Sequence, residues 1–172
     1  MPVALTPLGR EQARALGGEL RDEPLDLCVV TEFPRVVETA ELALTGREVP
    51  RLVVADLNDP GYGDFEGAQL EDYRAWASTS PSSAVPGPGG ESRLAIVERY
   101  VRGYRTVLAR PERSILVVAH SLPISYALGA REGIEPGARV PLAELAHPYR
   151  FSRRELEDAV ELLAAWAAAP TW

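Results

Sequence analysis

The sequence contains no lysine, so arginine supplies all 18 of its basic residues. This absence excludes Schiff-base chemistry on a lysine amine and the lysine of a P-loop nucleotide site. Arginine is therefore the one fixed cation that the sequence offers to an anion, and its guanidinium group suits carboxylates and phosphates.

Cysteine and histidine are nearly as scarce. The single cysteine, Cys28, lies in an apolar run, where a small core residue is expected rather than a reactive thiol. One cysteine makes neither a disulfide framework nor a CxxC pattern. With His120 and His147 as the only histidines, the chain has no histidine-rich cluster, and we expect neither a metal nor a cofactor.

Long hydrophobic runs and a secretory signal are also missing, so we expect a cytoplasmic protein that has no membrane partner. The formal net charge of −7 argues against nucleic acid as a partner. A length of 172 residues with 46% hydrophobic content fits one domain, residues 1–172, with a sizeable core.

Helix and strand patterns alternate along the chain. Apolar runs at residues 25–30 and 114–119 indicate buried strands, and a third apolar segment at residues 51–55 indicates another strand. Segments with helical patterning or helix-start signals occur at residues 8–20, 35–44, 70–78, 92–110, 123–130 and 153–168. Residues 139–151 are poorly patterned and suggest at most one irregular strand. The order predicts an α/β fold, a three-layer α/β/α sandwich around a mostly parallel sheet.

Two segments share one pattern, in which a buried strand is followed by a short turn and a proline that opens a helix. LDLCVVTEFPR places Arg35 in the first turn of its helix, and SILVVAHSLPI places His120 at the end of the strand, just before the next helix. If the strands are parallel neighbours, both turns lie on one edge of the sheet, where ligands bind in open α/β folds. Taken alone, Arg35 also fits a solvated surface arginine, and His120 also fits a core histidine. Together with two helix N-termini, the two residues indicate an anion site.

The loop DLNDPGYGDFEG carries the carboxylates Asp56, Asp59, Asp64 and Glu66. Clustered carboxylates can bind a hard cation, but their spacing does not match an EF-hand, and a solvated acidic turn is the simpler interpretation. One of these carboxylates can also serve as a general acid beside the anion site.

Five motifs in chain order resemble the histidine phosphatase superfamily, which has the phosphoglycerate-mutase-like fold. LTPLGREQARALG resembles its first helix, and TEFPRVVETA resembles Ser-Ser-Pro-x-x-Arg-x-x-x-Thr-Ala. LNDPGYGDFEG resembles Leu-Arg-Glu-x-x-x-Gly-x-Trp-Glu-Gly, PGGES matches a recurrent loop, and VVAHSLPI resembles Val-Val-Ser-His-Gly-x-x-Ile.

The resemblance implies a role for each matched residue in a small phosphorylated ligand's site. Arg35 and His120 would bind phosphate, and Asp59, in place of the usual glutamate, would donate the proton to the leaving alcohol. Supporting positions are Thr39, Glu66 and Ser121, the last of which replaces a glycine.

The family's opening strand ends in Arg-His-Gly and supplies the nucleophilic histidine, but this motif does not occur in the 172 residues. His147 follows no strand-to-helix turn and is a poor substitute. The family's missing strand would lie beside the one that ends at His120, so we expect unpaired backbone groups there. A start upstream of Met1, repacking or strand exchange in a homodimer, or a decayed phosphatase relative would each explain the departure.

Three functions therefore stay open at this stage. The first is phosphomonoester hydrolysis through a phosphohistidine, and the second is a non-catalytic pseudophosphatase that holds phosphate or a phosphorylated ligand. Phosphoglycerate mutase is the weaker third alternative, since the chain is compact around the expected site.

Overall fold

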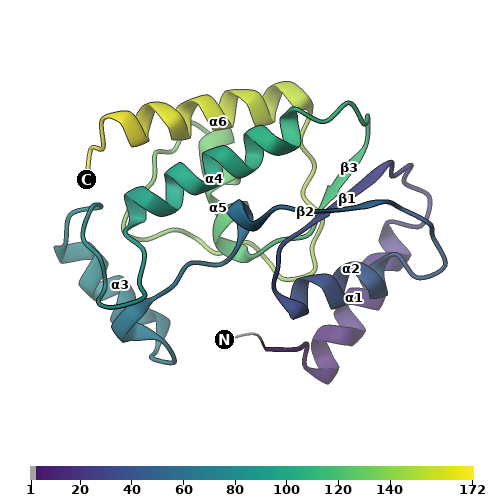
Figure 1. Ribbon diagram of the computed structural model, residues 1–172, viewed down its shortest axis with the longest axis horizontal. Helices are drawn as coiled ribbons and strands as arrows, with labels where there is room; N and C mark the ends of the chain where they lie inside the picture. Colours follow the sequence, from purple (N-terminus) through teal and green to yellow (C-terminus); the bar gives the residue numbers. More distant parts are fainter. Residues whose placement is uncertain (1–2) are drawn as a thin grey trace.

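The computed structural model describes residues 3–172, which form six α-helices, three strands and two short 3₁₀-helices (Figure 1). The strands are β1 (Leu27–Val30), β2 (Arg51–Val53) and β3 (Ile115–Val117). The helices are α1 (Pro7–Glu19), α2 (Pro34–Ala43), α3 (Leu70–Thr79), α4 (Arg93–Leu108), α5 (Ser121–Arg131) and α6 (Arg153–Ala168), with η1 (Ala55–Leu57) and η2 (Gly63–Phe65) between β2 and α3.

The three strands form a parallel sheet in the order β2-β1-β3. All four residues of β1 are buried, as expected for a central parallel strand covered on both faces. Successive side chains of β1 alternate between the two faces, so Leu27 and Val29 enter one core cluster while Cys28 and Val30 enter another.

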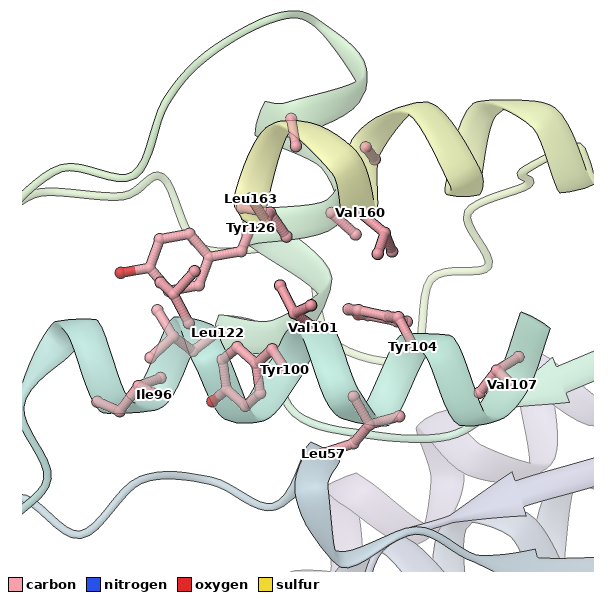
Figure 2. Close-up of a cluster of buried hydrophobic side chains, with 14 of the residues drawn as sticks. Leu57, Ile96, Tyr100, Val101, Tyr104, Val107, Leu122, Tyr126, Val160 and Leu163 are labelled. Atoms are coloured by element: carbon pink, nitrogen blue, oxygen red, sulfur yellow. The ribbon is translucent and has the colours of Figure 1, made fainter. Parts of the chain in front are cut away.

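Helices cover both faces of the sheet, which confirms the predicted layered α/β architecture (Figure 1). On one face lie α1 and α2, whose close approach depends on Gly17, because a Cβ there would lie 2.6 Å from the Ala43 carbonyl oxygen. On the other face α4, α5 and α6 build the larger cluster. Figure 2 shows Val101 and Tyr104 of α4 facing Val160 and Leu163 of α6.

Local sequence signals set where several helices begin. The Thr6 hydroxyl accepts a hydrogen bond from the Gly9 N–H, and Ser92 does the same for Ala95 at the start of α4. At α6, Ser152 and Glu155 form a capping box, in which each side chain accepts a backbone N–H of the other residue.

Three details of the sequence prediction are wrong. The strand expected over residues 51–55 ends at Val53, because the chain turns into η1. The helix after β3 begins at Ser121, with His120 as its N-cap, so Pro123 is its third residue and not its first. Residues 139–151 contain no strand; the backbone of Ala143 bonds instead to the hydroxyls of Ser121 and Ser125.

Among the described residues, β3 lies at an edge of the sheet. The Val118 N–H donates to the Val29 carbonyl, and the Ser114 carbonyl accepts from the Asp26 N–H. Since alternate residues of a parallel strand serve opposite sides, Ile115 and Val117 direct their backbone groups away from β1. A cavity of about 1410 Å³ lies along this edge, between side chains of α1 and side chains of α4 and α6.

Candidate active site

Four polar side chains converge where β1 and β3 end. Thr31 directly follows β1, and Arg35 is the second residue of α2. His120 is the N-cap of α5, and Asp59 lies just beyond η1. The predicted meeting of the two strand ends is thus confirmed, because Arg35 and His120 are in contact although 85 residues separate them in the sequence.

One nitrogen of Arg35, the predicted phosphate-binding arginine, links the two predicted catalytic residues. Arg35 Nη2 donates to Asp59 Oδ2 at 2.7 Å and lies 3.1 Å from His120 Nδ1. The His120 side chain is only 4% exposed, whereas those of Arg35 and Asp59 are 28% and 29% exposed. The guanidinium and the carboxylate therefore face the cavity, and a ligand can reach both.

The hydrogen bonds of His120 determine which ring nitrogen carries its proton. A guanidinium nitrogen only donates, so Nδ1 must accept from Arg35, and the neutral ring carries its hydrogen on Nε2. Nε2 lies 3.1 Å from Thr31 Oγ1, which accepts this hydrogen. The ring edge also meets Phe33, with 4.9 Å between centroids and an interplanar angle of 78°.

Burial lowers the pKa of His120 to about 3, and the charges of Arg35 and Arg99 add to the shift. The ring is therefore neutral at physiological pH, and its 3.7 Å approach to Asp59 is not an ion pair there. Burial raises the pKa of Asp59, while Arg35 opposes that shift through its charge and hydrogen bond. The site thus holds a carboxyl group whose pKa is raised beside a neutral imidazole.

Arg99 of α4 holds the loop that carries Asp59. Its guanidinium donates to the carbonyls of Asp56 and Asn58 at 3.0 and 2.8 Å, and it pairs with Glu91 at 2.8 Å. The arginine side chain is only 14% exposed, so these bonds lie in a partly dry environment. The loop is fixed immediately before Asp59.

The three predicted supporting residues make local contacts. Thr39 lines the cavity and donates to the Arg35 carbonyl at 2.8 Å, within α2. Glu66 accepts the Tyr62 N–H at 2.8 Å and closes the turn after Asp59. Ser121 donates to the Ala143 carbonyl at 3.2 Å. Their roles in ligand binding stay predictions.

His147 takes no part in the hydrogen bonds that join Thr31, Arg35, Asp59 and His120. It lines another part of the cavity, and its ring packs on Tyr149 with 4.8 Å between centroids. Within residues 3–172, no three His, Cys, Asp or Glu side chains are grouped so as to hold a metal ion. The same part of the chain contains no helix long and apolar enough to span a membrane.

The site thus combines a partly exposed arginine, a neutral histidine and a carboxyl group of raised pKa at the carboxyl ends of parallel strands, the edge where ligands bind in open α/β folds. The chain matches the histidine phosphatase superfamily (branch 1) over residues 1–162. It therefore belongs to the histidine phosphatase superfamily, which confirms the resemblance seen in the sequence motifs.

Relatives in this family carry more than one activity. An adenosylcobalamin/alpha-ribazole phosphatase of Salmonella typhimurium is 33% identical over 129 residues, which cover 69% of this chain and 62% of the relative. A 2,3-bisphosphoglycerate-dependent phosphoglycerate mutase of Methylobacterium sp. (strain 4-46) is 36% identical over 130 residues, 67% of this chain and 62% of the relative. The chain thus spans less than two thirds of the length of these curated relatives.

A solved structure supports the same fold. The alpha-ribazole phosphatase from Shigella flexneri superposes with a TM-score of 0.67 at 29% sequence identity. The superposition covers 78% of this chain and 70% of that one.

Sequence reasoning did not single out Thr31, Phe33 or Arg99. Thr31 directly follows the predicted strand at residues 25–30, as His120 directly follows the one at residues 114–119, and this shared position in the sequence is the signal that points to it. The place of Arg99 within an amphipathic helix gives no such signal, because its partners are backbone carbonyls brought together by tertiary structure.

Proposed function

We propose that this chain provides the phosphate-binding and proton-donating groups of a phosphomonoester hydrolase. The observation that carries the proposal is the bridge made by Arg35 Nη2 between Asp59 and His120 at the rim of the cavity. In an empty site, the carboxylate occupies the place on the guanidinium that a phosphate oxygen would take.

On phosphate binding, a phosphate oxygen would replace Asp59 as the hydrogen-bond partner of Arg35. The guanidinium turns from Asp59 to a phosphate oxygen, and free backbone N–H groups at the starts of α2 and α5 add partial positive charge. His120 Nδ1 is released from Arg35, takes up a proton and donates to the same phosphate group. These donors stabilise the charge that develops on the oxygens in the transition state.

Asp59 then acts as the general acid. Its pKa is already raised by burial, and losing Arg35 as a partner removes an interaction that favours the ionised form. A nearby phosphate charge favours the neutral form further. Binding of the substrate thereby protonates the group that must give its proton to the leaving alcohol.

The nucleophile has to come from a fourth strand in this account. The family resemblance implies a histidine from Arg-His-Gly, and the 172 residues contain no such motif. The open edge of β3 and the apolar cavity beside it can accommodate an extended segment that pairs with Ile115 and Val117. Such a segment, running parallel to β3, would end beside Arg35 and His120.

A second function has an observation in its favour. Because His120 is buried and its Nδ1 is engaged by Arg35, the described site offers no free imidazole as nucleophile. This favours a non-catalytic protein that holds phosphate or a phosphorylated ligand. Hydrolysis of an aryl phosphate after a segment with Arg-His-Gly is joined ahead of the 172 residues would decide for the enzyme, and phosphate binding without hydrolysis in that longer protein would decide for the binder.

Titration calorimetry with inorganic phosphate tests the shared part of both proposals. Replacing Arg35 with alanine should weaken phosphate binding by roughly 10- to 100-fold, since a charge-assisted hydrogen bond is lost. Arg154→Ala is the matched control, because its side chain is 88% exposed on α6 and pairs only along its own helix. Equal affinity of Arg35→Ala and the wild type would contradict the assignment.

A further inference from the structure

Thr31 is the polar residue of the site that the reaction scheme has not used. It follows the last residue of β1 and is 0% exposed. Its Oγ1 lies 3.1 Å from His120 Nε2, on the side of the ring opposite the nitrogen that contacts Arg35.

The backbone immediately before Thr31 is held by hydrogen bonds from both sides of β1. The Val29 and Val30 carbonyls accept hydrogen bonds from Val118 and Val54 respectively. Threonine is β-branched, so its χ1 rotamers are restricted, and a buried hydroxyl on such a side chain has a well-defined position. Thr31 is therefore suited to hold another group in place.

We propose that Thr31 is a positioning residue that keeps the His120 proton on Nε2 and thereby reserves Nδ1 for the ligand. The inference rests on the proposed function, since it gives His120 Nδ1 the role of facing a bound phosphate. Thr31 Oγ1 accepts from Nε2–H when the ring is neutral and continues to accept when the ring is cationic. The extra proton, taken from water, then goes to Nδ1, the nitrogen at the cavity.

The charges around His120 favour protonation of Nδ1 after the anion has bound and not before. Arg35 of α2 and Arg99 of α4 disfavour the cationic ring, while Asp59 in the loop after η1 lies 3.7 Å from Nδ1 and favours it. A phosphate dianion that draws Arg35 away adds negative charge on the same side as Asp59. Protonation at Nδ1 therefore follows anion binding, whereas Nε2 keeps its bond to Thr31 throughout.

Removing the Thr31 hydroxyl should change which tautomer the neutral His120 ring prefers. In Thr31→Val, Nε2–H would be buried without an acceptor, which is unfavourable. The neutral ring should shift towards the tautomer with hydrogen on Nδ1, which faces the Arg35 donor and repels it. Valine keeps the shape of the side chain, and Thr31→Ser keeps the hydroxyl.

Nitrogen-15 NMR of the imidazole rings tests the inference, because the chain has only two histidines and Thr31 does not contact His147. We expect the phosphate-free wild type and Thr31→Ser to show His120 as the Nε2–H tautomer. Thr31→Val should show a shift towards Nδ1–H, with phosphate affinity lowered at least about tenfold. His147 should be unchanged in all three proteins.

Unaltered His120 nitrogen shifts in a folded Thr31→Val protein would overturn the inference, and so would an Nδ1–H tautomer in the wild type. Lower phosphate affinity with an unchanged tautomer would show that Thr31 acts only through packing, which also overturns it. The tautomer is read without phosphate, so failure of the wild type to bind phosphate would count against the proposed function alone. If Thr31→Val does not fold, the wild-type spectrum still decides.

Discussion

Replacing Leu57 with alanine should lower the free energy of unfolding by about 2–5 kcal/mol. Leu57 is 0% exposed in η1, and its side chain fills the space above Gly103 of α4, where a Cβ would come within 2.7 Å of it. Truncation leaves a cavity that neighbours on two elements cannot close. Urea denaturation followed by circular dichroism measures the loss.

Leu145→Ala provides the matched control for this prediction. Leu145 is 73% exposed, so the same truncation should change the free energy of unfolding by less than about 0.5 kcal/mol. Because η1 leads directly to Asp59, Leu57→Ala should also make the position of the Asp59 carboxyl group less fixed. Equal stabilities of the two variants would contradict the packing that we describe for η1.

Asp59→Asn should bind inorganic phosphate about tenfold more tightly than the wild type. The carboxylate competes with phosphate for Arg35 Nη2, which it contacts at 2.7 Å, and it also repels the phosphate charge. Asparagine removes the charge, which ends the repulsion and weakens the competition to that of a neutral amide oxygen, while keeping the size of the side chain. The partial exposure of the pair limits the gain, since solvent screens it.

The pH dependence of this gain has a definite sign. The pKa of Asp59 is raised, and below that pKa the wild-type carboxyl is neutral and resembles asparagine. The ratio of the two affinities should therefore approach one as pH falls through the pKa of Asp59. Taking the ratio at each pH cancels the titration of phosphate itself.

Asp72→Asn removes the same charge from an exposed position of α3 and serves as the control. It should leave phosphate affinity at the wild-type value. Weaker binding by Asp59→Asn than by the wild type would show that the carboxylate helps to hold the anion, and competition for Arg35 would then be wrong.

The predicted neighbourhood of Arg35 and His120 follows from local patterns alone. The carboxyl ends of neighbouring parallel strands lie at one edge of the sheet. Arg35 and His120 both lie shortly after such an end, and they are in contact. The role of Asp59 came from the family resemblance of LNDPGYGDFEG, because no periodic pattern specifies where an irregular loop lies. Arg99 shows why: a tertiary contact from α4 holds the loop carbonyls.

Element boundaries were less predictable than element types. Pro123 is a typical first residue of a helix, yet α5 begins two residues earlier because His120 supplies the extended N-cap. Residues 139–151 take no regular structure, and two serines of α5 bond to the backbone there, an arrangement that residue spacing does not encode.

The open edge of β3 links the sequence expectation to the proposed chemistry. The sequence predicts unpaired backbone groups beside the strand that ends at His120, and the structure has the cavity of about 1410 Å³ at that edge. The residues proposed to bind phosphate and to donate the proton lie in this chain, whereas the proposed nucleophile would enter with a strand that fills the cavity.

A crystal structure of the chain with bound phosphate is the most direct test of the central claim that Arg35 exchanges Asp59 for phosphate. The account predicts phosphate oxygens within hydrogen-bond distance of Arg35 and of His120 Nδ1, with the contact between Arg35 and Asp59 broken. Phosphate bound elsewhere, with Arg35 Nη2 still 2.7 Å from Asp59 Oδ2, would contradict it.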